Sequence, residues 1–137
     1  MTKLIVALDV DSVADAEAIV DEIGSPVEWY KIGKQLFTRE GKSAVEMLKR
    51  KGKKVFLDLK FHDIPNTVAQ AVKSALSIGA DMVNFHASGA GEMIRKTVDL
   101  NKAENPQALL IAVTVLTSMD QTALDELGIQ GNPAQDA

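Results

Sequence analysis

The stretch that decides the fold spans residues 55–67 and reads VFLDLKFHDIPNT. Side chains of a β-strand alternate between its two faces, so the odd-numbered residues from 55 to 59 form one apolar face. Asp58 and Lys60 lie together on the other face. Burying two charges is costly unless they pair, and folding does not require them at this place. The stretch therefore predicts a strand that ends in a charged pair with a chemical role.

Similar apolar runs alternate with segments of helical period along the chain. The expected strands are residues 3–9, 27–33, 53–60, 81–86 and 108–116. The expected helices are residues 13–23, 42–51, 65–78, 89–102 and 120–127, the first of them capped by Ser12. Such alternation is typical of βαβ units, which build a parallel sheet.

Polar residues at the expected strand ends favour a barrel over an open, doubly wound sheet. They are Asp9, Asp58, Lys60, His86, Thr114 and Thr117, and Lys31 lies in the second strand. In a (β/α)₈ barrel the carboxyl ends of all strands converge on one mouth, whereas an open sheet often has a Gly-rich first turn at its site. The first turn, residues 9–12, reads DVDS and contains no glycine. The sequence therefore predicts an α/β fold of the TIM-barrel family.

The length limits how much of a barrel the chain can form. A complete barrel takes roughly 250 residues. The chain has 137 residues, and its pattern gives about five strands. We therefore expect residues 1–137 to be the N-terminal part of a single barrel domain, with the second half absent from the chain. The first and fifth strands would then be exposed edges.

Composition and charge narrow the class of protein. The net charge is −4 and no basic stripe is present, so nucleic acid is not an expected partner. The absence of cysteine excludes a disulfide framework and a thiolate site. The chain enters a strand pattern at its first residues without a signal-peptide pattern, and no apolar run approaches the ~20 residues of a membrane span. We expect a cytoplasmic protein that does not bind membranes.

Five residues of alternating charge are the candidate site: Asp9, Lys31, Asp58, Lys60 and Asp63. A structural ion pair is the alternative interpretation of Asp58 and Lys60. Polar residues at the ends of four neighbouring strands argue against that alternative, because one chance pair would not explain them all.

Other polar residues keep a structural alternative. His86 is also consistent with a core histidine bonded to the backbone, and Asn66 and Thr67 with caps of the helix that follows. His62 is expected at the surface or behind the site, without a catalytic role.

Residues 56–67, FLDLKFHDIPNT, resemble the signature of the orotidine 5′-phosphate decarboxylase family, and of its bacterial members in particular. Four further stretches agree in order and spacing: VALD at 6–9, KIGK at 31–34, MVNFHASG at 82–89 and VTVLTSM at 113–119. The D-x-K-x-x-D core is moderately specific alone. Together with the other stretches it makes the resemblance specific, and the resemblance covers essentially the whole chain.

This resemblance implies decarboxylation of orotidine 5′-monophosphate to uridine 5′-monophosphate, a step of pyrimidine biosynthesis, without a cofactor or metal. It makes Lys60 the proton donor, with Asp58 and Lys31 as its fixed neighbours. Asp63 would reach into the site of the other subunit of a homodimer. The implied substrate contacts are Asp9 and Lys31 at the ribose hydroxyls, Thr67 near the ribose, Thr117 at the pyrimidine, and Asp58, Lys60, Asp63 and Ile64 across the two chains.

The chemistry of that reaction fits the residues around Lys60. Loss of CO₂ leaves carbanion character at C6 of the pyrimidine, which a fixed ammonium stabilises and then protonates. The carboxylates of Asp58 and Asp63 favour the charged amine. A Schiff-base lysine would instead need a neutral amine with few acids around it.

Two alternatives stay open. One is a relative on the same scaffold, 3-keto-L-gulonate 6-phosphate decarboxylase, which shares D-x-K-x-x-D but uses Mg²⁺. The resemblance gives that relative an acidic residue in the second strand, where Lys31 of this chain would repel the metal. The other alternative is an inactive half-barrel that only dimerises. The family's phosphate-binding residues belong to later strands, which motivates this second alternative.

Overall fold

A computed structural model of the protein describes residues 2–129, in which five strands form one parallel sheet. The strands pair in chain order: β1 (Ile5–Ala7), β2 (Trp29–Gly33), β3 (Lys54–Phe61), β4 (Met82–His86) and β5 (Leu109–Val113). A doubly wound sheet reverses its strand order at a switch point, whereas a barrel keeps the order sequential. The prediction of a parallel α/β fold of the barrel class is therefore confirmed, with β1 and β5 at the two edges of the sheet.

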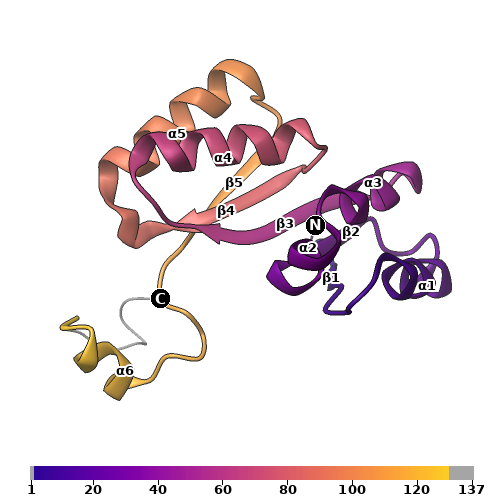
Figure 1. Ribbon diagram of the computed structural model, residues 1–137, viewed down its shortest axis with the longest axis horizontal. Helices are drawn as coiled ribbons and strands as arrows, with labels where there is room; N and C mark the ends of the chain where they lie inside the picture. Colours follow the sequence, from indigo (N-terminus) through magenta and orange to yellow (C-terminus); the bar gives the residue numbers. More distant parts are fainter. Residues whose placement is uncertain (1, 130–137) are drawn as a thin grey trace.

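Helices connect the strands and gather in two groups. They are α1 (Val13–Ile23), α2 (Lys34–Glu40), α3 (Lys42–Arg50), α4 (Pro65–Ser77), α5 (Ala90–Glu104) and α6 (Gln121–Glu126), with a 3₁₀ turn, η1 (Ala87–Gly89). Figure 1 shows α4 and α5 side by side along β4 and β5, and α1 to α3 near the N-terminal strands. Helix α6 lies beyond the end of β5.

Local signals account for the ends of two helices. The Ser12 side chain accepts a hydrogen bond from the Asp15 N–H at 3.1 Å, which confirms Ser12 as the cap of α1. Pro65 is the first residue of α4, where its missing N–H costs nothing. The residue before it, Ile64, occupies the cap position, and no side chain caps this helix. The alternative that Asn66 and Thr67 serve as caps is therefore wrong.

The predicted elements differ from the structure in two respects. Helix α2 was not predicted, because it is only seven residues long, follows β2 directly and contains just two large apolar residues, Leu36 and Phe37. The edge strands are shorter than expected, three residues for β1 and five for β5. An edge strand extends only as far as its single neighbour pairs with it, and β4 offers β5 five partners.

The two faces of the sheet have different roles. Side chains of one face pack with the helices in the core, among them Leu8, Tyr30, Ile32, Val55, Leu57, Val83 and Phe85. Partners across parallel strands share a face, so the pairings Lys31 with Phe56 and Phe56 with Met82 place these residues on the opposite face. None of the three belongs to the core cluster. The charged residues of the sequence motif therefore lie on the face that the core leaves free.

Candidate functional site

The carboxyl ends of β1, β2 and β3 bring four charged side chains together. Ala7 pairs with Lys31 and Gly33 pairs with Asp58, so the ends of these strands lie at one level. Asp9 follows β1 by two residues, and Lys60 lies near the end of β3. Four of the five residues predicted as the site are thus assembled by the sheet alone.

Asp58 is the centre of this charged network, which consists of Asp9, Lys31, Asp58 and Lys60. Its Oδ1 atom accepts from the Lys60 ammonium at 2.6 Å, and its Oδ2 atom lies 3.4 Å from the Lys31 ammonium. The Asp58 side chain is 11% exposed, against 64% for Asp9. The buried carboxylate of Asp58 therefore contacts both amines, while the carboxylate of Asp9 faces solvent.

The surroundings of Asp58 decide its protonation. Burial alone would raise the pKa of this carboxyl, but hydrogen bonds from Lys60 and Asn84 and the charges of Lys60 and Lys31 outweigh burial and lower its pKa from 3.8. Asp58 is consequently ionised at neutral pH.

Lys31 bridges the two carboxylates of the network. Its ammonium lies 3.4 Å from Asp9 Oδ1 as well as 3.4 Å from Asp58 Oδ2. Gly33 leaves the space for this bridge, because a Cβ atom there would stand 3.3 Å from Lys31 Nζ and 3.5 Å from Asp9 Oδ1. The result is an alternating row of acid and amine in which each amine has an acidic neighbour.

Asn84 joins this network, although the sequence argument gave it no role. Its side chain is buried in β4, donates from Nδ2 to Asp58 Oδ1 at 2.7 Å and accepts the backbone N–H of Lys60 at 2.8 Å. The available signal was a single amide inside the run MVNFH, on the same strand face as His86. A buried polar side chain in a strand needs partners, and that requirement could have directed attention to it.

Three predicted substrate residues lie just beyond this network: Asp63 and Ile64 in the connection from β3 to α4, and Thr67 in the first turn of α4. Asp63, Ile64 and Thr67 are exposed, and Ile64 is 67% exposed. The Asp63 carboxylate accepts the Ile64 N–H at 2.7 Å, and no ion pair joins it to Lys60 within residues 2–129. Within the described residues, Asp63 therefore stays outside the ion pairs that join Asp9, Lys31, Asp58 and Lys60.

The remaining predicted residues occupy different surroundings. Thr117 lies in an exposed turn after β5, and no hydrogen bond joins it to the charged network in the described part of the chain. His86 is partly buried at the end of β4, with its ring centroid 5.3 Å from that of His62. Burial lowers the pKa of His86, as do the nearby charges of His62, Lys34 and Lys60. This imidazole is therefore neutral at neutral pH.

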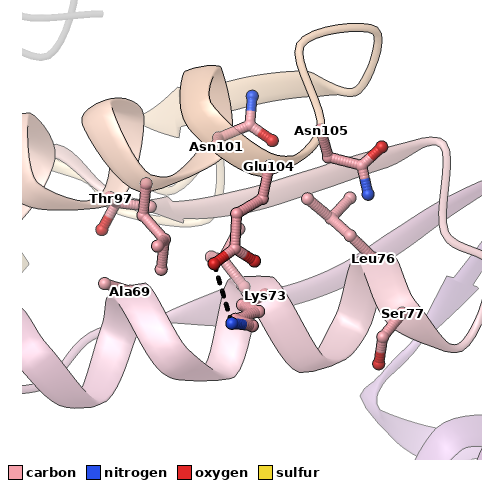
Figure 2. A pocket seen from close by; sticks show the side chains of 10 residues that line it. Ala69, Lys73, Leu76, Ser77, Thr97, Asn101, Glu104 and Asn105 are labelled. Carbon is pink, nitrogen blue, oxygen red and sulfur yellow. Dashed lines mark hydrogen bonds and ion pairs between the residues drawn. The ribbon is translucent and has the colours of Figure 1, made fainter.

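A cavity between α4 and α5 lies apart from the network. It has a volume of about 100 Å³, and Figure 2 shows Lys73 of α4 paired with Glu104 of α5 at its rim, 2.8 Å apart. Its lining comes from these two helices and Asn105. It contains none of the charged residues of the strand ends, so the chemistry of the site does not involve it.

The described residues contain neither a cluster of possible metal ligands nor a helix that could span a membrane. Within residues 2–129, no three His, Cys, Asp or Glu side chains come together as possible ligands of a metal ion. In the same range, every helix is too short or too polar to cross a lipid bilayer. The strand ends hold two amines, Lys31 and Lys60, beside the ionised carboxylate of Asp58. This arrangement suits stabilisation of developing negative charge and delivery of a proton.

Comparison with known proteins places this arrangement in a family. The model of the family described as "Orotidine 5'-phosphate decarboxylase / HUMPS family" matches residues 2–136. The orotidine 5′-phosphate decarboxylase of Idiomarina loihiensis is 48% identical over 135 residues, covering 98% of this chain and 58% of the relative. The Vibrio cholerae enzyme of that name is 49% identical over 134 residues, 96% of this chain and 57% of the relative. The chain thus spans little more than half the length of these curated relatives.

Solved structures agree with the sequence comparison. The crystal structure of orotidine 5′-phosphate decarboxylase from Lactobacillus acidophilus superposes with a TM-score of 0.87 at 35% identity, covering 98% of this chain and 63% of that one. An uncharacterised conserved protein from Geobacillus kaustophilus gives a TM-score of 0.88 at 40% identity, with 96% and 63% coverage.

Proposed function

Because this chain belongs to the orotidine 5′-phosphate decarboxylase / HUMPS family, we propose that it supplies the catalytic amine of an enzyme that converts orotidine 5′-monophosphate to uridine 5′-monophosphate. The observation that carries this proposal is the Lys60 ammonium, 2.6 Å from the buried Asp58 carboxylate on the core-free face of the sheet. This amine is held by a buried carboxylate at the carboxyl end of the sheet, where the polar residues of neighbouring strands converge.

Lys60 is the proposed proton donor. Breaking the bond between C6 and the carboxylate leaves an electron pair at C6, and an ammonium beside that carbon stabilises the pair. The pair then takes a proton from Lys60 Nζ, so CO₂ leaves and a C–H bond replaces the C–C bond. No electron acceptor enters this balance, and the proposal requires neither cofactor nor metal.

Asp58 and Lys31 are the proposed partners that hold this amine in place. The two oxygens of Asp58 face one amine each, at 2.6 Å and 3.4 Å. Holding a reacting group in a fixed geometry removes much of the entropic cost of reaching the transition state. A Schiff-base role for Lys60 is disfavoured, since that chemistry needs a neutral amine.

The ribose and pyrimidine contacts are proposed for residues around this centre. Asp9 and Lys31 would bind ribose hydroxyls, a role supported by the exposure of Asp9 beside the Lys31 ammonium. Thr67 would lie near the ribose, Thr117 would contact the pyrimidine, and Ile64 would complete the substrate contacts.

Asp63 is proposed to complete the site of a partner subunit in a homodimer. Its exposure supports this role, because an exposed acid is available to a second chain. The site would then contain residues of two chains, and dimerisation would be necessary for full activity.

We further propose that residues 1–137 form the N-terminal part of one (β/α)₈ barrel that acts in the cytoplasm. Support for the barrel comes from the sequential strand order and from apolar residues at the sheet edges: Ile5 is 37% exposed, Leu109 49% and Ile111 40%. Such surface on edge strands normally pairs with further strands.

Turnover of orotidine 5′-monophosphate tests the proposal. The chain is assayed alone and after mixing with the residues of the Idiomarina loihiensis relative that follow the matched region, a mixture called here the complemented protein. We expect the complemented protein to decarboxylate the nucleotide and the chain alone to do so weakly or not at all. A folded complemented protein without turnover would contradict the proposed reaction.

Addition of EDTA separates the proposal from the magnesium-dependent alternative. The Lys31 ammonium occupies the place between Asp9 and Asp58, where its charge would repel a divalent cation. Turnover should therefore be the same with and without the chelator. Activity that disappears with EDTA and returns with Mg²⁺ would favour the other decarboxylase.

A further inference from the structure

Asn84 is a buried amide in the middle of a strand. Asn84 is 3% exposed, and its chain neighbours Val83 and Phe85 belong to the core. An amide in such a place is costly unless both of its ends are satisfied. Its partners therefore decide what it does.

Both ends of the Asn84 amide are engaged by the charged network. The Oδ1 atom accepts the Lys60 backbone N–H at 2.8 Å, and Nδ2 donates to Asp58 Oδ1 at 2.7 Å. This same Asp58 oxygen accepts from Lys60 Nζ at 2.6 Å. A backbone N–H needs an oxygen and a carboxylate needs a donor, so only this orientation of the amide satisfies both.

The backbone at Lys60 explains why such a partner is needed. Lys60 has a φ of 52°, in the left-handed region that residues other than glycine seldom adopt, and the pairing of β3 with β4 shifts register between Leu57 and Phe61. A bulge of this kind removes a residue from the regular ladder and re-aims its side chain. The Asn84 oxygen takes the N–H that the irregularity turns away from the ladder.

We propose that Asn84 is a positioning residue, which sets the Lys60 ammonium by holding both the Lys60 backbone and the Asp58 carboxylate. Asn84 itself contacts neither substrate nor reacting atoms in this account. The three groups form a closed loop: backbone N–H to amide oxygen, amide nitrogen to carboxylate, and carboxylate to ammonium of the same lysine. Only the kinetic part of the test rests on the proposed function.

Two substitutions separate the two hydrogen bonds. Asn84→Asp keeps an acceptor for the Lys60 N–H but places a second carboxylate against Asp58. Asn84→Ala removes both contacts. The matched control is Thr97→Val, which removes a buried hydrogen bond from α5, 2.8 Å from Thr97 Oγ1 to the Met93 carbonyl, and leaves the site untouched.

Two measurements on the chain alone do not depend on catalysis. Exchange of the Lys60 amide hydrogen should accelerate about tenfold or more in Asn84→Ala and stay slow in Asn84→Asp and Thr97→Val. Titration of the Asp58 carboxyl by ¹³C NMR should shift to higher pH in both Asn84 variants, most in Asn84→Asp, with no shift in Thr97→Val. If Asn84→Ala does not fold, the titration of Asp58 in the isosteric Asn84→Asp variant still tests the positioning role of Asn84.

The kinetic measurement uses the complemented protein. A misplaced amine lowers the rate of the chemical step more than substrate binding, so kcat should fall about 10- to 100-fold in both Asn84 variants, with KM changed less than about threefold. Thr97→Val should stay within about twofold of the unchanged protein. Absence of turnover in the unchanged protein would count against the proposed function alone, because exchange and titration still test the positioning.

The inference is overturned if folded Asn84→Ala keeps the slow exchange of the Lys60 amide, or if the titration of Asp58 is unchanged in the folded Asn84 variants. It is equally overturned if they show normal kcat in an active complemented protein. A purely structural role would lower the unfolding temperature in these variants while leaving titration and kcat unchanged.

Discussion

Asp58 orders the charged residues around it because it is the least exposed acid of the network. It accepts from Lys60 and Asn84 and faces Lys31 through its second oxygen. An ionised carboxylate can accept several donors at once, so Asp58, Lys60, Asn84 and Lys31 fix one another.

Replacing Asp58 should make stability depend on pH in a defined direction. Asp58→Asn is expected to lower the free energy of unfolding by about 1–3 kcal/mol at neutral pH, because two donors lose a charged acceptor. The pKa of Asp58 is lowered from 3.8 in the folded chain. Its stabilising contribution is thus fully present above pH 3.8 and is lost as pH falls through the lower folded-state value.

Urea unfolding of both proteins over a range of pH measures this effect. The difference in unfolding free energy should shrink once the pH drops below 3.8. A difference that stays constant to the acid end of the range would show that the Asp58 charge contributes nothing.

The sequence predicted some, but not all, of the individual residues of the site. The alternation of strand faces placed Asp58 and Lys60 together, and convergence of the strand ends added Asp9 and Lys31. Alternating charge alone could not place Asp63, because its position depends on the connection after β3 rather than on the sheet. The role of Asn84 depends on a bulge that no local pattern in the sequence marks.

Strand β3 pairs regularly with β2 on one side and irregularly with β4 on the other. Its pairing with β2 is regular through Gly33 and Asp58, which places the acid beside Lys31. Its pairing with β4 shifts register before Phe61, and that shift changes the direction in which the Lys60 side chain points. A regular strand builds the frame, and one irregular residue sets the direction of the amine.

The elements were predicted to different degrees for a physical reason. Strand and helix periods are visible where an element buries a long apolar stripe, as α4 does with Val68, Val72 and Leu76. Helix α2 has one fully buried residue, Leu36, and so provides too short a stripe to recognise. The lengths of β1 and β5 are set by pairing with β2 and β4 rather than by their own sequence.

The edge strand β5 should make the isolated chain bind dyes that report exposed apolar surface. Replacing two of its exposed residues together, Leu109→Lys and Ile111→Lys, should lower this dye binding and any self-association, since both side chains lie at a sheet edge. Fluorescence of a bound dye and light scattering give the result. The control is Leu127→Lys, at an exposed leucine next to α6, which should change little. A monomer that binds no dye would contradict the proposed open edge.

One face of the sheet packs against the helices, and the other carries the charged network. We propose that the site on this second face is completed by later strands of the barrel and by a second subunit. The two kinds of partner make different demands, because strands extend the sheet edges while a subunit meets the loops at its carboxyl ends.

Mixed dimers test whether the site is shared between subunits. Lys60→Ala and Asp63→Asn variants of the complemented protein, each inactive alone, should regain about a quarter of normal turnover when mixed, because half the dimers are mixed and each has one intact site. Lys60→Ala mixed with Asp58→Asn is the matched control. It should show no rescue beyond the single variants if Asp63, but not Asp58, acts across the interface. Equal behaviour of the two mixtures would contradict a shared site.

The turnover rate of Lys60→Ala tests the central claim most directly, with Lys73→Ala as control. Lys73 forms an exposed ion pair with Glu104 far from the strand ends, so its loss should leave the rate within about twofold. In the complemented protein, with folding checked by circular dichroism, we expect Lys60→Ala to lose turnover by about 10³-fold or more. Near-normal decarboxylation by folded Lys60→Ala would contradict the assignment of this ammonium as the proton donor.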